Sequence, residues 1–187
     1  MERCEVQALI DRLAERHTDW TVFEALARHI VRDEHALRAV LDAITSHPNP
    51  KVRRLCADLM DHHGDDRCVE TLRQALHDPV PRVRRQAVHS LSCQRCKTCA
   101  LTVGVVPVLT DVALTDENMW VRREAVCALA FQPRDARAAA ALRVLLARET
   151  DPKITSEVHG ALRIHDEEYR RASNAAARVR QQRIDRM

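Results

Sequence analysis

The sequence has few aromatic residues and few glycines: two tryptophans, two phenylalanines, one tyrosine and three glycines in 187 residues. A folded core must therefore be aliphatic. The 45% hydrophobic residues, mostly Leu, Val, Ala and Ile, are sufficient to build one. Because these residues recur at helical spacing and sheet folds fit such a composition poorly, the sequence predicts an all-α protein.

Long apolar runs are also missing. No run approaches the roughly 18 residues that cross a membrane, and the N-terminal segment MERCEVQALIDRLAER has charges where a signal peptide would be apolar. The seven cysteines are odd in number and follow no secretion signal, so reduced thiols are expected. These absences predict a cytoplasmic protein that does not associate with membranes.

A strong excess of one charge is absent as well, since the net charge is only +3. Residues 169–187 contain six arginines and one aspartate, a net +5, which leaves −2 for residues 1–168. A nearly neutral body is not typical of a protein that grips nucleic acid over a whole face. The tail could contact phosphate, or it could be a solvated capping helix that runs into disorder.

The main positive feature is an internal repeat. Residues 49–57 (NPKVRRLCA) recur as residues 80–88 (VPRVRRQAV) and as residues 118–126 (NMWVRREAV), with the Val-Arg-Arg anchors 31 and 38 residues apart. Weaker copies lie one period to either side, near Trp20 and Pro152. Periods of this length are typical of solenoid proteins.

Each copy predicts a pair of antiparallel helices. Residues 52–60 place apolar side chains at i, i+4, i+7 and i+8, which is one stripe of a helix. Gly64 is expected to end this helix in the left-handed conformation, and residues 69–76 supply a second apolar stripe. Because one such hairpin leaves apolar edges uncovered, the copies are expected to stack on one another.

The predicted organisation is a single repeat domain, residues 1–168, followed by a basic helix or tail, residues 169–187. A capping helix is expected at about residues 5–16. The predicted repeats span about residues 18–47, 48–78, 79–115, 116–149 and 150–168, with a cysteine-rich insert at 92–103.

Three segments resemble a known family. Residues 78–87 (DPVPRVRRQA), the pair Gly64-Asp65, and residues 106–116 (VPVLTDVALTD) are similar to the HEAT-like repeats named after phycobilisome lyases. The resemblance covers roughly residues 18–165. It implies a right-handed α-solenoid, an armadillo-like alpha-alpha superhelix of about five hairpins, and it says little about activity because the shared residues are structural.

The resemblance also implies where a partner would bind. In this family the first helix of each pair usually lies on the convex side and the second lines the concave side. The candidate partner-binding residues on the second helices are Arg38, Arg73, Gln74, Asp111 and Arg143.

The arginines of the repeat allow two interpretations. Arg53, Arg84 and Arg122 occupy the same place in successive repeats and would align on stacking. They could bond acidic or carbonyl groups at the turns between repeats, such as Asp78 or Asp116, and so lock the stacking. They could instead form a basic rail for nucleic-acid phosphate.

The insert contains Cys93, Cys96 and Cys99, three thiols at two-residue gaps. Thiolates at this spacing can converge on a zinc ion, which needs four ligands, and His89 or Cys127 could supply the fourth. The spacing is also similar to that of ferredoxin iron–sulfur ligands, although the fourth cysteine of that pattern is absent. The alternatives are free thiols or a labile disulfide. A structural zinc would hold an insert that otherwise has little to pack against.

The sequence indicates no catalytic group, since a phosphate loop, a nucleophile elbow and an HExxH motif are all missing. The favoured function is a non-catalytic scaffold that binds another protein. The alternatives are a lyase or DNA-repair-type enzyme, implied by the family resemblance, and nucleic-acid binding through residues 169–187. Oligomeric state cannot be inferred from the sequence.

Overall fold

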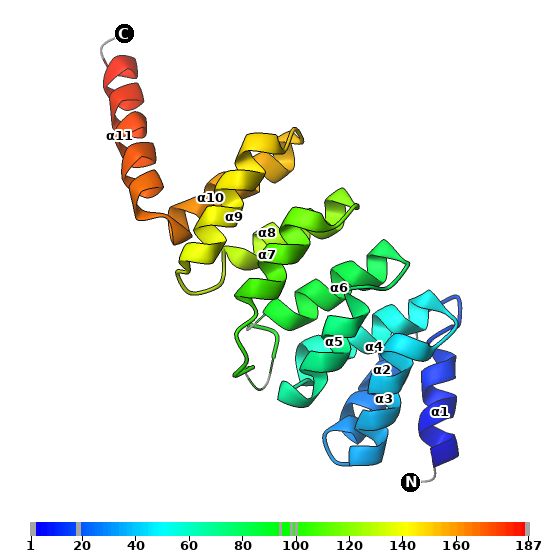
Figure 1. Cartoon of the computed structure of the whole chain (residues 1–187). Coiled ribbons are helices and arrows are strands. Elements are labelled where there is room, and N and C mark those ends of the chain that lie inside the picture. Colours follow the sequence, from blue (N-terminus) through cyan, green and yellow to red (C-terminus); the bar gives the residue numbers. More distant parts are fainter. Residues whose placement is uncertain (1–2, 18–19, 94, 98, 100, 186–187) are drawn as a thin grey trace. The chain divides into compact units, whose positions relative to one another are not determined.

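The computed structural model describes residues 3–17, 20–93, 95–97, 99 and 101–185, and over these residues it is all-helical with no strand (Figure 1). The all-α prediction is therefore confirmed. The predicted N-terminal capping helix is present but ends earlier than expected. The elements are α1 Arg3–Arg12, α2 Trp20–Ile30, α3 Glu34–Ser46, α4 Pro50–His63, η1 Asp66–Cys68, α5 Val69–Ala75, α6 Pro81–Ser92, α7 Val106–Thr115, α8 Met119–Leu129, α9 Ala136–Arg148, α10 Pro152–His165 and α11 Glu167–Ile184.

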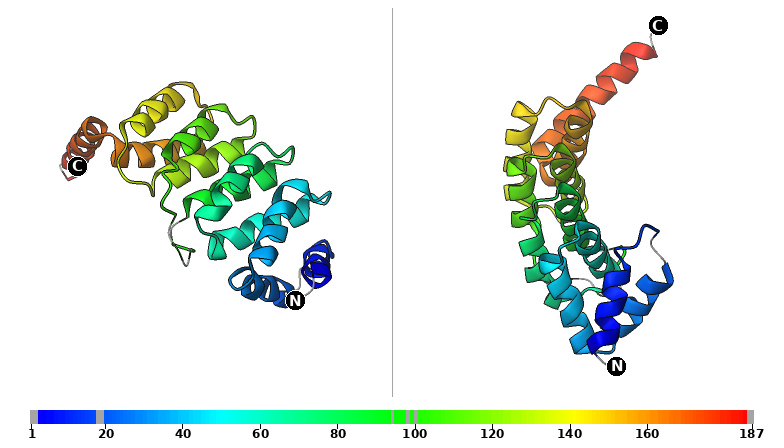
Figure 2. Two further views of the ribbon diagram at one scale, coloured as in Figure 1. Left: turned by 60° about the horizontal axis from the view of Figure 1, so that its bottom comes forward. Right: turned by 90° about the vertical axis from the view of Figure 1, so that its right-hand side faces the viewer.

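The chain forms two compact units, residues 1–105 and 106–187. In the first unit α4 packs against α6 in one layer and α3 packs against α5 in the other, with contacts between the layers (Figure 2). The second unit repeats this arrangement, with α8 against α10 and α7 against α9. Within each unit the hairpins thus stack first helix on first helix and second on second, as predicted for a helical solenoid. The unit boundary falls inside the third predicted repeat.

The first helices of the five hairpins bury the same positions. The third and seventh residues of each of these helices are at most 2% exposed. The eleventh residue of each is at most 3% exposed. Stacked copies of one helix need identical apolar stripes, and this spacing supplies them. The third-position residues are Val22, Val52, Val83, Val121 and Ile154.

The starts of the first helices are set locally. Asn49, Asn118 and Asp151 act as N-caps, and each side chain accepts a hydrogen bond from the backbone amide two residues later. Pro50 and Pro152 follow at the first helical position, where a missing amide hydrogen costs nothing. The start of a first helix is therefore determined by a few neighbouring residues. Among the described helices, none combines the length and the apolar composition that a membrane crossing requires.

The prediction that Gly64 takes the left-handed conformation is wrong. Its φ is −77° and its ψ is 153°, so the chain leaves α4 in an extended conformation. A Cβ at this position would lie 2.5 Å from the Met60 carbonyl oxygen and 2.8 Å from the Cys68 sulfur. Glycine is required here because the next segment passes close to the end of α4.

We expect Gly64→Ala to destabilise the protein by about 1–3 kcal/mol, because the added methyl group meets backbone atoms that cannot move freely. Gly160→Ala is the matched control, since a Cβ at Gly160 would meet nothing within 4 Å. Alanine inside α10 should raise stability by about 0.5–1 kcal/mol. Urea unfolding of the two variants measures both effects, and equal stability of the two would contradict this account of Gly64.

Candidate functional site

The arginines of the repeat turn toward the end of the preceding second helix. Backbone carbonyls in the turn that follows a helix have no partner within that helix, and these side chains bond one such carbonyl in each repeat. In each case Nη1 donates to the backbone carbonyl six residues earlier: Arg53 to His47 at 2.8 Å, Arg84 to Asp78 at 2.9 Å and Arg122 to Asp116 at 3.1 Å.

Arg53 and Arg122 also form ion pairs. Arg53 binds the Asp78 carboxylate through Nε at 2.6 Å and Nη2 at 3.0 Å, and the two side chains are 10% and 5% exposed. The same carboxylate accepts a hydrogen bond from the Val80 amide at the turn before α6. Arg122 takes Glu149 as its carboxylate partner, at 3.0 Å from Nη2. The ladder arginines are therefore engaged within the protein, which favours the structural interpretation over a phosphate rail.

The candidate partner-binding residues differ in whether their side chains are bonded to other residues of the protein. Arg143 pairs with Asp166 at 2.5 Å and lies 3.4 Å from Glu168, so it holds the start of α11. Arg38, Arg73 and Asp111, by contrast, make no side-chain hydrogen bond or ion pair with any residue that the structure describes. Gln74 is exposed at the end of α5. Arg38 and Arg73 lie on α3 and α5, which pack side by side.

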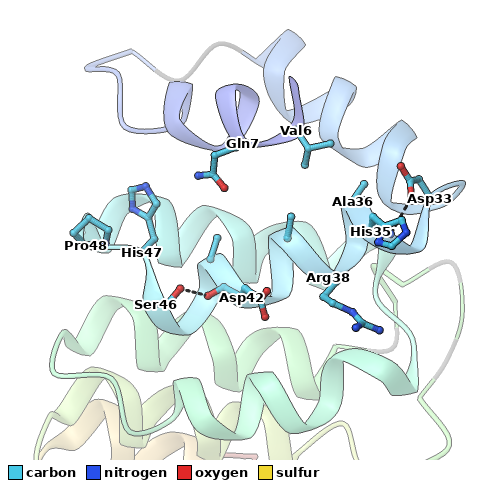
Figure 3. A pocket seen from close by; sticks show the side chains of 12 residues that line it. Val6, Gln7, Asp33, His35, Ala36, Arg38, Asp42, Ser46, His47 and Pro48 are labelled. Carbon is cyan, nitrogen blue, oxygen red and sulfur yellow. Dashed lines mark hydrogen bonds between the residues drawn. The ribbon is translucent and has the colours of Figure 1, made fainter. Parts of the chain in front are cut away.

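A groove of about 570 Å³ lies between α1 and α3, and Arg38 is one of its lining residues (Figure 3). Ala36, Ala39 and Ala43 give α3 a low apolar surface here, and Val6 faces it from α1. The rim carries hydrogen-bond donors and acceptors, and both positively and negatively charged side chains. The polar lining residues are Gln7, Asp33, His35, Arg38, Asp42, Ser46 and His47.

The basic tail is largely one helix, α11, which begins at Glu167 and has no buried residue among those described. Glu167 accepts hydrogen bonds from Arg170 at 2.7 Å and from Arg171 at 3.0 Å. Arg134 bonds the same carboxylate, and these three partners lower the pKa of Glu167 to about 2. Part of the predicted positive charge is thus paired within the protein. Arg186 lies outside the described residues.

The cysteine insert follows α6, and the structure gathers part of the predicted metal set. One ligand atom each from His89, Cys93, Cys96 and Asp61 lies within 4.8 Å of the other three. Cys99 is exposed and does not belong to this group. Cys127, the other suggested ligand, lies on α8 in the second unit, where burial raises the pKa of its thiol to about 11.

The two clustered thiols share a hydrogen bond. Burial raises the pKa of Cys93, but hydrogen bonds from the Cys96 side chain and from the backbone amides of Cys96 and Arg95 outweigh it and lower the pKa overall. The same bond, with burial, raises the pKa of Cys96 to about 12. Cys93 is therefore the thiol that ionises first.

Sequence reasoning missed two members of this environment, Asp61 and Lys97. Asp61 is on α4, 28 residues before His89, and only the packing of α4 against α6 brings them together. Lys97 Nζ donates to the carbonyl oxygens of Met60 at 2.9 Å and Asp61 at 3.3 Å. An acidic residue on the buried stripe of α4 was the available sequence signal for Asp61.

Comparison with known proteins identifies the repeat. Residues 37–103 match the family described as HEAT repeats. No curated protein matches the chain. Among solved structures, the chain is similar to a crystal structure of an engineered protein, Northeast Structural Genomics Consortium target OR329. The identity is 21% over 86% of this chain and 78% of that chain, with a TM-score of 0.47.

The chain therefore contains HEAT repeats over residues 37–103, and HEAT repeats are commonly scaffolds for protein interactions. The matched family is defined by its repeat rather than by a reaction. The similarity to the phycobilisome-lyase type, and the lyase or DNA-repair activity that it implies, stay predictions.

Proposed function

We propose that the chain is a non-catalytic scaffold that binds another protein through the layer formed by α3 and α5. The observation that carries the proposal is that the arginines differ in whether the protein itself binds them. Those of the repeat ladder are bonded inside the protein, whereas the exposed Arg38 and the half-buried Arg73 make no side-chain hydrogen bond or ion pair with the described residues.

The chemistry of this layer favours a protein segment over a polyanion. Arg38 lies on the same helix as Asp42, and the groove beside them combines an alanine floor with rim groups of both signs. A nucleic-acid site would need a surface of one sign. The partner that fits is a segment with carboxylates for Arg38 and Arg73 and a small apolar side chain for the half-buried Ala39.

The double variant Arg38→Glu/Arg73→Glu should weaken capture of this partner by about tenfold or more, because like charges then face each other across the interface. Arg82→Glu, an exposed change on α6, is the matched control and should leave capture unchanged. The measurement is affinity capture with each variant, followed by titration calorimetry with the protein that the double variant fails to retain.

The proposal fails if both variants retain the same proteins. It also fails if nuclease treatment abolishes capture, since this would identify nucleic acid as the ligand. Deletion of residues 169–187 tests that alternative directly, because salt-sensitive nucleic-acid binding through the tail would be lost with it.

A further inference from the structure

Four side chains meet at one point where α4, α6 and the insert come together. Asp61 projects from α4, His89 from the last turn of α6, Cys93 is the C-cap of α6, and Cys96 lies on the loop that follows. One ligand atom from each lies within 4.8 Å of the others, and Asp61 Oδ2 is 3.5 Å from His89 Nε2. Ligands of a tetrahedral zinc ion are separated by about 3.3–3.8 Å, so modest side-chain rotations would complete the site.

The state of Asp61 is a second, independent observation. The residue is 2% exposed, and its Oδ1 has no hydrogen-bond partner within the described chain. A buried carboxylate oxygen is normally satisfied by a donor or a cation. An aspartate with an unsatisfied oxygen, beside two thiols and an imidazole, is therefore well placed to bind a metal ion.

Lys97 places a positive charge next to this group of ligands. Its ammonium group is buried and is held on the last carbonyls of α4, by Met60 and Asp61. Two thiolates and a carboxylate carry one negative charge more than a zinc ion neutralises. The positive charge of Lys97 balances it, so the filled site would be neutral overall. The same lysine fixes the loop that presents Cys96.

We propose that Asp61, His89, Cys93 and Cys96 bind one zinc ion with tetrahedral geometry, and that Asp61 takes the place that the sequence pattern suggests for Cys99. Two sulfur ligands with nitrogen and oxygen suit zinc, whereas an iron–sulfur cluster normally takes four cysteine ligands. Four protein ligands leave no open position, so the ion is structural: it ties α4, α6 and the cysteine-rich insert into one body.

The first experiment measures metal on the whole chain. Protein expressed with added zinc and purified with a non-thiol reductant should contain about one zinc per chain by elemental analysis. Replacement by Co²⁺ should give the intense visible bands of tetrahedral cobalt and a thiolate charge-transfer band. Absence of zinc together with absence of these bands would overturn the proposal, and no variant is needed for this test.

The second experiment assigns the ligands. Asp61→Asn and Cys93→Ser should each lower the zinc content clearly below one per chain, whereas Cys99→Ser, the matched control, should keep it at the wild-type level. Circular dichroism of each variant checks that the helices are intact, and cobalt spectra on the refolded chains provide the readout if zinc is lost during purification. Loss of zinc in Cys99→Ser but not in Asp61→Asn would overturn the ligand set.

A disulfide is the competing chemistry for Cys93 and Cys96. Peptide mapping after alkylation, on protein purified without reductant, distinguishes the two. Alkylation-resistant cysteines that become reactive on chelation support zinc. A Cys93–Cys96 disulfide in a protein whose reduced form binds neither Zn²⁺ nor Co²⁺ overturns the proposal.

Discussion

Replacing Arg53 by methionine should destabilise the first unit by about 3–5 kcal/mol, the cost typical of removing one partner from a buried ion pair. Arg53 and Asp78 bond through two nearly parallel hydrogen bonds, and the Asp78 side chain is only 5% exposed. In Arg53→Met this carboxylate stays buried without its counterion. The carbonyls of His47 and Pro48 lose a donor at the same time. Hydrogen exchange of peptides from α4 and α6, measured by mass spectrometry under native conditions, reports the loss.

Two controls separate the ion pair from a general effect of substitution. Arg53→Met/Asp78→Asn removes the stranded charge while the amide oxygen can still accept from the Val80 amide, so it should regain about 1–2 kcal/mol. Arg82→Ala, on the exposed side of α6, should change stability by less than about 0.5 kcal/mol. If the double variant is no more stable than Arg53→Met, the buried charge is not the cause.

His165→Ala should lower the free energy of unfolding of the second unit by about 2–4 kcal/mol, because it leaves two backbone groups without a hydrogen-bond partner. The imidazole is 4% exposed. Its Nε2 lies 2.8 Å from the Leu129 carbonyl oxygen at the end of α8, and its Nδ1 lies 3.1 Å from the Asp135 amide nitrogen, the N-cap of α9. A carbonyl accepts and an amide donates, so the ring is the neutral tautomer with its proton on Nε2. One side chain thus joins α8, α9 and α10.

Urea unfolding measures this loss, and long-range proton–nitrogen spectra of the histidine ring test the tautomer. His35→Ala, an exposed histidine on α3, is the control and should change stability by less than about 0.5 kcal/mol. A ring protonated on Nδ1, or a His165→Ala variant as stable as His35→Ala, would contradict the bridging role.

The periodic parts of the fold were predictable because they depend on short-range rules. Val52, Val83 and Val121 mark the same buried position in three helices, and the asparagines and prolines before them mark where helices start. Repetition makes this signal strong, since each copy supports the interpretation of the next.

Sequence reasoning was weakest where one position depends on a distant one. The sequence predicts a left-handed, helix-ending conformation for Gly64. Glycine is instead required because a Cβ at this position would collide with the Met60 carbonyl oxygen and the Cys68 sulfur. The metal hypothesis gathered cysteines that are neighbours in sequence and included Cys99. The fold brings Asp61, from another helix, beside His89, Cys93 and Cys96.

The sequence by itself determined that the chain forms stacked helical hairpins, where most of them begin, and which side chains line their contacts, because helix capping and apolar periodicity act within a few residues. The tertiary structure decided which polar groups meet: it selected Asp78 for Arg53 from the partners that the sequence suggested, and it alone joined His165 with Leu129 and Asp135 and Asp61 with the two thiols. These partners lie about 25 to 36 residues apart, roughly one repeat, so the stacking of one hairpin on the next brings them together.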